Sequence, residues 1–325
     1  MNSKPHPFQK RIKYQGDITI LLKQVAKDYN LGKYKSHEVV GVGYEDFNVI
    51  LETDKYKYFV KFLADFRDEK ECKRYVEIIN TALKNNIRHP KLYKSNQGGL
   101  YEIDTKDGMI RLIVLEYIDG KTFFDLKQKP TEAEQNILIE QAALINKIDF
   151  KPTFLYDSWA VVNFLKEYKE IKDKLKQSDI DLIQPIVDQF SQIDIESLPH
   201  CFVHGDIIDT NVMKSKDGDL LILDFAVSNY YPRIQELAVM LCDILFDPKK
   251  SEGFKEVYKR TLSVYQKYIK LTYLELETLP LYIKAAHAMH IIGAAKSAID
   301  MGESEENDHW MEAGRQGINK INLTK

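Results

Sequence analysis

The sequence predicts an α+β protein of two lobes, in which a small antiparallel β-sheet with one helix precedes a mainly helical lobe. Two observations carry this prediction. The first third of the chain contains paired segments rich in β-forming residues, and after Asp119 and Gly120 helical periodicity dominates, interrupted by one β-rich island. With 325 residues, of which 44% are hydrophobic and 29% charged, the chain is long enough to bury a core in one large or two ordinary domains.

The N-terminal lobe is expected to span residues 1–118. Residues 1–36 are predicted to form a polar lead-in and one helix, because apolar residues recur at helical spacing from Ile18 to Val25. A hairpin, a helix packed on it and a second strand pair are then expected in order: Val39–Glu52 with Tyr56–Leu63, Phe66–Asn85, and Leu100–Ile103 with Ile110–Ile118.

The C-terminal lobe is expected to span residues 119–325. Its helical segments are followed by the β-rich island and by further helices from Ile234 onward. The helices are expected at Thr131–Ile148, Trp159–Lys176 and Asp179–Gln192, and the strands of the island at Cys201–Val203, Val212–Met213 and Leu220–Phe225. A sheet-rich lobe followed by a helical lobe suggests a cleft between them.

Composition and charge exclude several classes of protein. The net charge of −3 gives no basic field for nucleic acid, and no apolar run reaches the roughly 18 residues of a membrane helix. The polar N-terminus has no apolar signal core, and three widely spaced cysteines form neither a disulfide framework nor a zinc pattern. We therefore expect a cytoplasmic protein that binds neither nucleic acid nor membrane; its oligomeric state is left open.

The β-rich island contains a constellation suited to phosphoryl transfer. It reads His204-Gly205-Asp206, four further residues and Asn211, and then an apolar strand that ends in Asp224. Transfer of phosphate from ATP requires a carboxylate that orients the acceptor hydroxyl and takes its proton, and oxygen ligands for Mg²⁺. Asp206 can supply the first, and Asn211 and Asp224 the second. The alternative is that this segment is a surface turn whose carboxylates have no catalytic role.

This pattern resembles the aminoglycoside phosphotransferase and choline kinase superfamily of protein-kinase-like folds, over residues 37–310. The resemblance implies a protein-kinase-like two-lobe fold that uses ATP and Mg²⁺, with Asp206 as the catalytic base and Asn211 and Asp224 as metal ligands. His204 is expected to brace the loop through hydrogen bonds rather than to react.

The resemblance also implies nucleotide-binding residues upstream. The segment from Gly43 to Asn48 is similar to the nucleotide-positioning loop of homoserine kinase-like members, whose backbone amides cover phosphates. Lys61, in an otherwise apolar strand, takes the place of the lysine that binds the α- and β-phosphates; the alternative is a lysine on the wet face of the strand. Its glutamate partner is expected to be Glu77, with Glu71 as the fallback.

The apolar segment that ends near Glu116 to Ile118 resembles the hinge, where backbone groups bind adenine. Downstream, Glu236 stands where the family has an aspartate. It either bonds the amides of the catalytic loop or is simply a carboxylate favoured in the first turn of a helix, and the sequence favours neither.

The acceptor is the least determined part. His287 and His290 share a helix face, so with Trp310 they either line an acceptor pocket or lie in the core. No third metal ligand stands near them in the sequence, so a zinc site is not expected here. Residues 1–118 carry a net charge of +5, which suits the binding of a triphosphate. Residues 119–325 carry a net charge of −8, which suits the binding of a metal ion and of an acceptor with an ammonium group.

The sequence thus predicts an ATP-dependent kinase that phosphorylates a hydroxyl of a small molecule, such as an amino alcohol, an amino sugar or an aminoglycoside-type acceptor. One alternative is a protein kinase, against which stand Gly205 in the loop and the short stretch between Asp224 and Glu236. The other is a pseudokinase that acts as a nucleotide-binding regulator, although Lys61, Asp206 and the metal ligands are all present.

Overall fold

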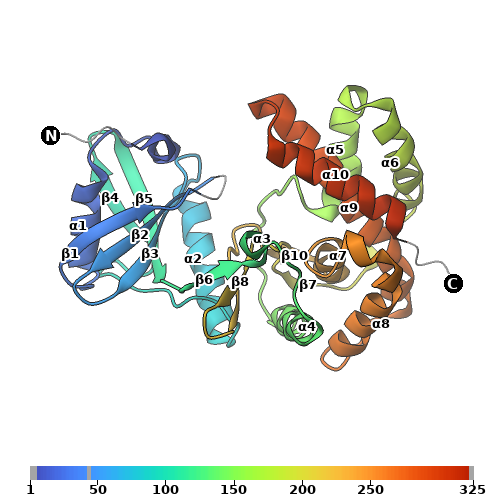
Figure 1. Ribbon diagram of the computed structural model, residues 1–325, viewed down its shortest axis with the longest axis horizontal. Helices are drawn as coiled ribbons and strands as arrows, with labels where there is room; N and C mark the ends of the chain where they lie inside the picture. Colours follow the sequence, from blue (N-terminus) through green and yellow to red (C-terminus); the bar gives the residue numbers. More distant parts are fainter. Residues whose placement is uncertain (1–5, 42–44, 322–325) are drawn as a thin grey trace. The chain divides into compact units, whose positions relative to one another are not determined.

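The computed structural model describes residues 6–41 and 45–321 and divides into two compact units, Met1–Asp119 and Gly120–Lys325, here called unit 1 and unit 2. Unit 1 holds a five-stranded antiparallel sheet, and unit 2 is mainly helical (Figure 1). The predicted α+β class is confirmed.

The sheet of unit 1 has the strand order β1-β2-β3-β5-β4. The predicted hairpin is β2 with β3, and the second predicted pair is β4 with β5. Residues 39–52 are not one strand, however, because β1 ends at Val39 and β2 begins at Phe47. The elements are η1 (Pro7–Ile12), α1 (Ile18–Asp28), β1 (Tyr34–Val39), β2 (Phe47–Thr53), β3 (Lys57–Phe62), α2 (Glu69–Lys84), β4 (Tyr101–Thr105) and β5 (Gly108–Glu116).

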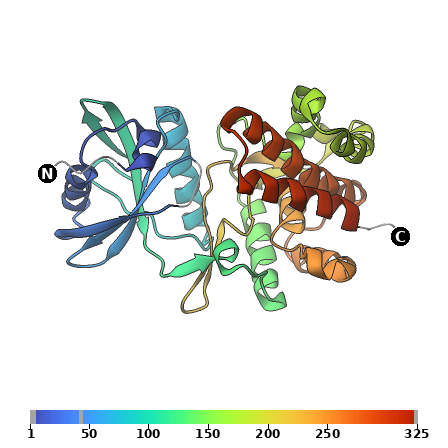
Figure 2. The same ribbon diagram turned by 45° about the horizontal axis from the view of Figure 1, so that its top comes forward.

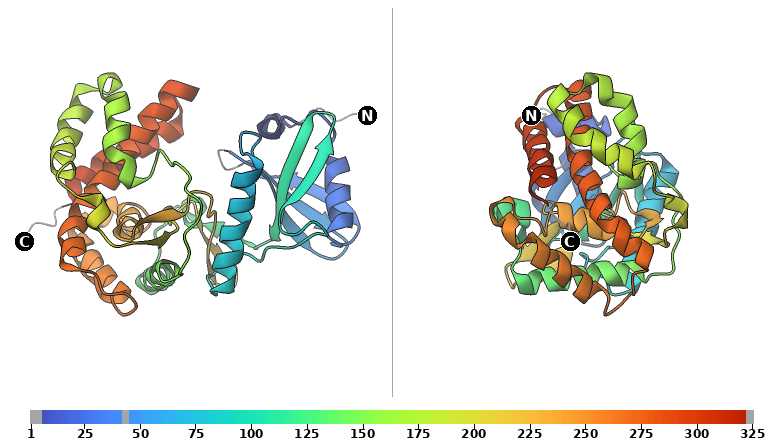
Figure 3. Two further views of the ribbon diagram at one scale, coloured as in Figure 1. Left: turned by 180° about the vertical axis from the view of Figure 1, so that it is seen from behind. Right: turned by 90° about the vertical axis from the view of Figure 1, so that its right-hand side faces the viewer.

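The two longer helices of unit 1 cover opposite faces of this sheet (Figures 1 and 3). Phe47, Val49 and Leu51 alternate along β2 and are fully buried in one apolar cluster with Leu22 and Val25 of α1. The opposite face meets α2, which begins at a capping box formed by Asp68 and Glu71. This second face carries Lys61.

Unit 2 contains two small sheets, one with the order β6-β8-β9 and one that pairs β10 with β7. The strands are β6 (Gly120–Thr122), β7 (His200–Val203), β8 (Val212–Ser215), β9 (Leu220–Ile222) and β10 (Asn229–Pro232). The sequence analysis missed β6 and β10, each no more than four residues long, because pairing with distant strands rather than local alternation defines them.

The helices of unit 2 form the larger part of its core, and α9 and α10 lie side by side (Figure 2). The α-helices are α3 (Phe123–Leu126), α4 (Glu132–Asn146), α5 (Phe164–Ile171), α6 (Gln177–Phe190), α7 (Ile234–Cys242), α8 (Phe254–Tyr265), α9 (Tyr273–Met301) and α10 (Glu305–Lys320). The 3₁₀ helices are η2 (Val161–Asn163), η3 (Lys172–Lys174), η4 (Ile195–Ser197) and η5 (Pro248–Gly253). Among the described helices, none has the length and hydropathy needed to cross a bilayer.

Candidate active site

The loop that joins β7 to β8, residues 204–211, is held by a buried carboxylate. The backbone amides of His204 and Gly205 donate to Glu236, at 2.6 Å to Oε2 and 3.2 Å to Oε1, and Asn146 Nδ2 donates to Oε2 at 3.3 Å. Gly205 has a φ of 84°, a conformation that suits glycine. Of the two interpretations of Glu236, the structure supports bonding to the loop amides, and its longer side chain still reaches them.

Burial governs the acidity of this carboxylate. Glu236 is fully buried, and desolvation raises its pKa to about 7, although the three N–H donors favour the charged form. A protonated carboxyl group could accept fewer of these bonds, so the ionised form is the one that holds the loop.

His204 braces the same loop, as the sequence predicts. Its Nδ1 accepts a hydrogen bond from the Asp206 amide at 3.1 Å, so the proton is on Nε2, which donates to the Leu223 carbonyl at 2.9 Å. Desolvation lowers the pKa of this fully buried imidazole to about 4, which keeps it neutral. Both ring nitrogens are used, and neither is left to react.

Asp206 and Asn211, five residues apart, form a direct pair within the loop. Asn211 Nδ2 donates to the Asp206 Oδ2 at 2.6 Å and to the Asp206 carbonyl at 3.1 Å. Desolvation raises the pKa of Asp206 well above its usual value, and the charges of Asp157, Asp224 and Asp243 raise it further. A carboxylate held by one amide and surrounded by negative charge is a strengthened proton acceptor.

Asp224 follows β9 in a left-handed conformation, with φ 57°, which is uncommon for a residue other than glycine. Its Oδ1 accepts the Ala226 amide at 3.3 Å, which stabilises the turn. One residue earlier, the Leu223 amide donates to the Asn211 carbonyl at 2.8 Å. This bond ties the loop to the end of the strand that presents Asp224.

The donor set of this region fits a hard divalent cation. Asn211 uses its amide nitrogen on Asp206, so its Oδ1 remains the ligand atom, and Asp224 adds a carboxylate. Amide and carboxylate oxygens are the ligands that Mg²⁺ accepts from proteins.

In unit 1, Lys61 is a buried, paired cation. Its Nζ lies 3.1 Å from Asp46 Oδ2 and 3.3 Å from the Tyr75 hydroxyl, and only 6% of the residue is exposed. Asp46 also accepts the Ala64 amide at 2.8 Å. The alternative that Lys61 lies on the solvent-exposed face of its strand is therefore wrong.

The expected partner of Lys61 requires correction. Glu77 stands two residues beyond Tyr75, or about 200° around α2, and is exposed on the opposite face of the helix. The fallback, Glu71, instead caps the helix by accepting the Asp68 amide at 3.1 Å. Asp46, which enters from the segment before β2, occupies the place that the sequence analysis gave to a glutamate of the helix.

A family model described as "Phosphotransferase enzyme family" matches residues 36–271, which include Lys61 and the whole loop with Asp224. The chain belongs to this family. The prediction of a phosphate-transferring enzyme is thereby confirmed, and the match ends before α9. None of the curated proteins matches the chain.

Solved structures of similar fold share little sequence with this phosphotransferase. A microcompartment-associated aminopropanol kinase is 12% identical with a TM-score of 0.67, over 93% of this chain and 95% of that one. The amicoumacin kinase hAmiN, solved with AMP-PNP, Ca²⁺ and Ami, is 16% identical with a TM-score of 0.67, over 98% of each chain. The choline kinase LicA from Streptococcus pneumoniae is 13% identical with a TM-score of 0.58, over 94% of this chain and 99% of that one.

The remaining predicted nucleotide-binding residues lie in or beside the sheet of unit 1. Asn48 is paired with Lys61 in the β2–β3 register, and its Oδ1 is buried without a hydrogen-bond partner in the described part of the chain. Glu116 ends β5, where its amide donates to the Lys91 carbonyl at 2.8 Å, and Ile118 follows. Gly43 lies outside the described residues.

Sequence reasoning missed two acidic residues of unit 2. Asp157 and Asp243 both raise the pKa of Asp206, and Asp243 Oδ1 accepts the Asp209 amide of the loop at 2.8 Å. Neither stands in a recognisable motif, so no local signal marks them. The histidines of α9 are buried in the core: His287 is fully buried, and His290 is 8% exposed.

Proposed function

We propose that the chain is an ATP-dependent kinase that transfers the γ-phosphate to a hydroxyl of a small molecule bearing an amine, such as an amino alcohol, an amino sugar or an aminoglycoside. The observation that carries this proposal is the loop of residues 204–211. It holds Asp206 against Asn211 at 2.6 Å, next to the strand end that presents Asp224.

In this proposal Asp206 is the general base. Its carboxylate accepts the proton of the acceptor hydroxyl while a bond forms between the hydroxyl oxygen and the γ-phosphorus. The bond from that phosphorus to the β,γ-bridging oxygen breaks, so the products are the phosphorylated acceptor and ADP. The hydrogen bond from Asn211 orients the carboxylate, and His204 orients its backbone.

Asn211 and Asp224 would hold Mg²⁺. When bound, the ion neutralises charge on the phosphates of the nucleotide. The positive charge would also offset part of the repulsion that Asp224 imposes on Asp206.

Lys61 would bind the nucleotide phosphates in unit 1. Its pairing with Asp46 supports this role, because a buried ammonium needs a fixed counter-charge that orients it. The backbone of Glu116 and Ile118 is the proposed adenine-binding segment, and Asn48, opposite Lys61, is a neighbouring polar group. The domain assignment follows: residues 1–118 bind nucleotide, and residues 119–325 carry catalysis and acceptor binding.

The charge around Asp206 supports an amine-bearing acceptor. Asp157, Asp224 and Asp243 all act on this carboxylate, so a cation near it is stabilised. Two proteins of similar fold are named as kinases of alcohols that carry a cationic nitrogen, aminopropanol and choline.

The test is release of ADP in the presence of ATP, Mg²⁺ and a panel of amino alcohols, amino sugars and aminoglycosides. With an acceptor that gives turnover, Asp206→Ala is expected to lower kcat by about 10²- to 10⁴-fold, as for loss of a general base, and to leave ATP binding intact. Asp217→Ala, which removes an exposed aspartate of the same unit, is the matched control and should keep wild-type kcat.

Full activity of Asp206→Ala would overturn the assignment of the base. The same assay is run on analogues of these acceptors in which hydrogen or hydroxyl replaces the amine. If these amine-free compounds were phosphorylated as efficiently as the amines, the proposed acceptor class would be wrong, while the kinase assignment would stand. ATP binding is measured separately by calorimetry, which distinguishes a failed base from a misfolded protein.

A further inference from the structure

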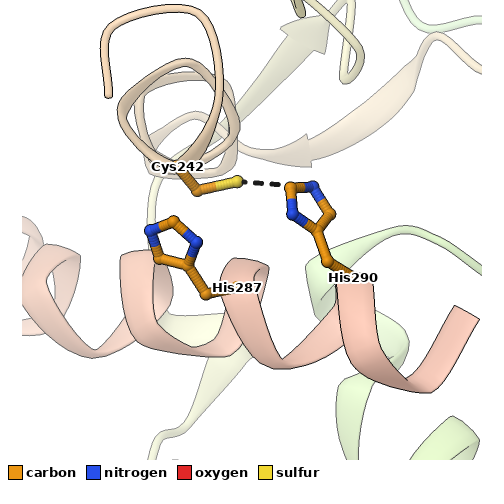
Figure 4. Close-up of side chains that lie close together, drawn as sticks. All are labelled: Cys242, His287 and His290. Carbon is orange, nitrogen blue, oxygen red and sulfur yellow. Dashed lines mark hydrogen bonds between the residues drawn. The ribbon is translucent and has the colours of Figure 1, made fainter. Parts of the chain in front are cut away.

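Three side chains that could bind a metal converge in the core of unit 2, and none of them belongs to the motif of the catalytic loop. Cys242 ends α7, and His287 and His290 project from α9 toward it (Figure 4). Their potential ligand atoms all lie within 4.8 Å of one another. Only 4% of Cys242, none of His287 and 8% of His290 is exposed to solvent.

These histidines have unused polar atoms. Both ring nitrogens of His287 and Nδ1 of His290 are buried without a hydrogen-bond partner among the described residues. The polar contact recorded within the cluster joins Cys242 Sγ to His290 Nε2 at 3.7 Å. With that contact counted as a hydrogen bond, His287 still has no hydrogen-bond partner among the described residues, which is rare for a fully buried imidazole.

We propose that Cys242, His287 and His290 bind one Zn²⁺ ion through one sulfur and two nitrogen ligands. With Zn–S near 2.3 Å and Zn–N near 2.0 Å, a tetrahedral ion holds its sulfur and nitrogen ligands about 3.5 Å apart. The observed 3.7 Å between Sγ and Nε2 is close to this value. Three protein ligands leave the fourth position for water.

The chemistry of the donors selects zinc over the Mg²⁺ of the nucleotide site. Thiolate and imidazole are soft or borderline ligands, whereas Mg²⁺ requires oxygen. The thiol loses its proton to solvent as the sulfur binds the ion.

The surroundings of the cluster are shaped to enclose it. The ring of Phe246 lies 5.1 Å from that of His287, and the ring of Trp310 lies 4.9 Å from that of His290. On α10, a Cβ at Gly317 would come within 2.0 Å of His287 Nδ1, so only glycine lets this helix pass so close. A neighbouring cation, Lys129, is already paired with a carboxylate, Asp209, at 3.3 Å.

A metal here would tie α7 to α9 close to the catalytic loop. Asp243, directly after Cys242, accepts the Asp209 amide, and α7 also carries Glu236. The family match ends at residue 271, so it includes Cys242 but neither histidine. The inferred role is to stabilise unit 2.

The experiment measures metal binding directly. The full chain is treated with a chelator, kept reduced by a phosphine, loaded with Zn²⁺ and desalted, and its zinc content is determined. Wild type and Cys72→Ala, which removes a buried thiol of unit 1, are expected to retain one zinc per chain, and Cys242→Ala and His287→Ala none. Asp224→Asn should also retain one, because the nucleotide-site carboxylate is not a ligand.

Cobalt provides a second readout that reports the sulfur ligand. Co²⁺ added to metal-free wild type should give a thiolate-to-cobalt charge-transfer band and raise the Tm, and Cys242→Ala should show neither. Absence of this band in wild type, or one retained zinc in Cys242→Ala, would overturn the proposal. If Cys242→Ala does not fold, the wild-type band and its loss in His290→Gln decide. None of these readouts depends on kinase activity.

Discussion

Unit 2 buries histidines in two contrasting ways. His204 is fully buried and uses both ring nitrogens, one on the Asp206 amide and one on the Leu223 carbonyl. His287 is equally buried, and neither of its ring nitrogens has a hydrogen-bond partner in the described part of the chain, whereas ligand atoms of Cys242 and of a second imidazole lie within 4.8 Å. Desolvation lowers the pKa of both rings, so their electrostatics do not distinguish them. Their hydrogen bonds do distinguish them. The imidazole of His204 is bonded to the backbone at both nitrogens, whereas that of His287 has no such bonds among the described residues and is available to a ligand.

The hydrogen-bond network of the catalytic loop has Glu236 at its centre. Breaking this network should lower the free energy of unfolding more than changing the histidine that has no hydrogen-bond partner among the described residues. Glu236→Ala leaves two loop amides without their acceptor and removes one of the two acceptors of the Asn146 amide, and we expect the free energy of unfolding to fall by about 3–5 kcal/mol. Urea denaturation measures this change. Glu256→Ala, at an exposed carboxylate in the first turn of α8, should change it by less than about 0.5 kcal/mol. A similar, small change in both variants would contradict the role of Glu236.

His204→Leu should have the next largest effect. It leaves the Asp206 amide and the Leu223 carbonyl unpaired, which should lower the free energy of unfolding by about 2–3 kcal/mol at pH 7.5. Because the amide of Asp206 loses its anchor, kcat should fall while ATP still binds. Unfolding curves and ADP-release rates of one preparation test both parts, and unchanged stability would show that the loop does not need its brace.

The loss of stability caused by His204→Leu should depend on pH. The pKa of His204 is about 4 in the folded chain against 6.5 as its ordinary value, so its contribution to stability is fully present above pH 6.5 and is lost as the pH falls toward 4. The difference in free energy of unfolding between wild type and His204→Leu should therefore shrink by about 2 kcal/mol from pH 7.5 to pH 5. Urea denaturation in Mg²⁺-free buffer at several pH values measures it. A difference independent of pH would mean that His204 is not buried in the neutral form.

The sequence predicted those parts of the site whose residues are close neighbours along the chain. His204, Asp206 and Asn211 lie within eight positions, and their contacts follow from one turn of loop. The position of Glu77 on the wrong face of α2 could also have been read from helical phase, because Tyr75 already marks the buried side.

Contacts between distant segments could not be predicted in this way. Asp46 reaches Lys61 only because β2 and β3 pair in one particular register. Cys242 and His290 are 48 residues apart and meet through helix packing, so a search for closely spaced ligands finds two histidines and no third group. Strands as short as β6 have too few residues for alternation to be recognised.

The smallest effect is expected for the unsatisfied histidine, and its sign depends on metal. In metal-free protein, His287→Leu removes two buried nitrogens that have no hydrogen-bond partner among residues 6–41 and 45–321, so the free energy of unfolding should change by less than about 1 kcal/mol, in either direction. In the presence of Zn²⁺ the wild type should gain stability and the variant should not, because an ion stabilises the folded state only when it binds that state more tightly than the unfolded chain. Parallel urea denaturation with chelator and with Zn²⁺ measures both. If His287→Leu costs as much as His204→Leu without metal, then His287 has hydrogen-bond partners in solution, and the contrast between the two histidines fails.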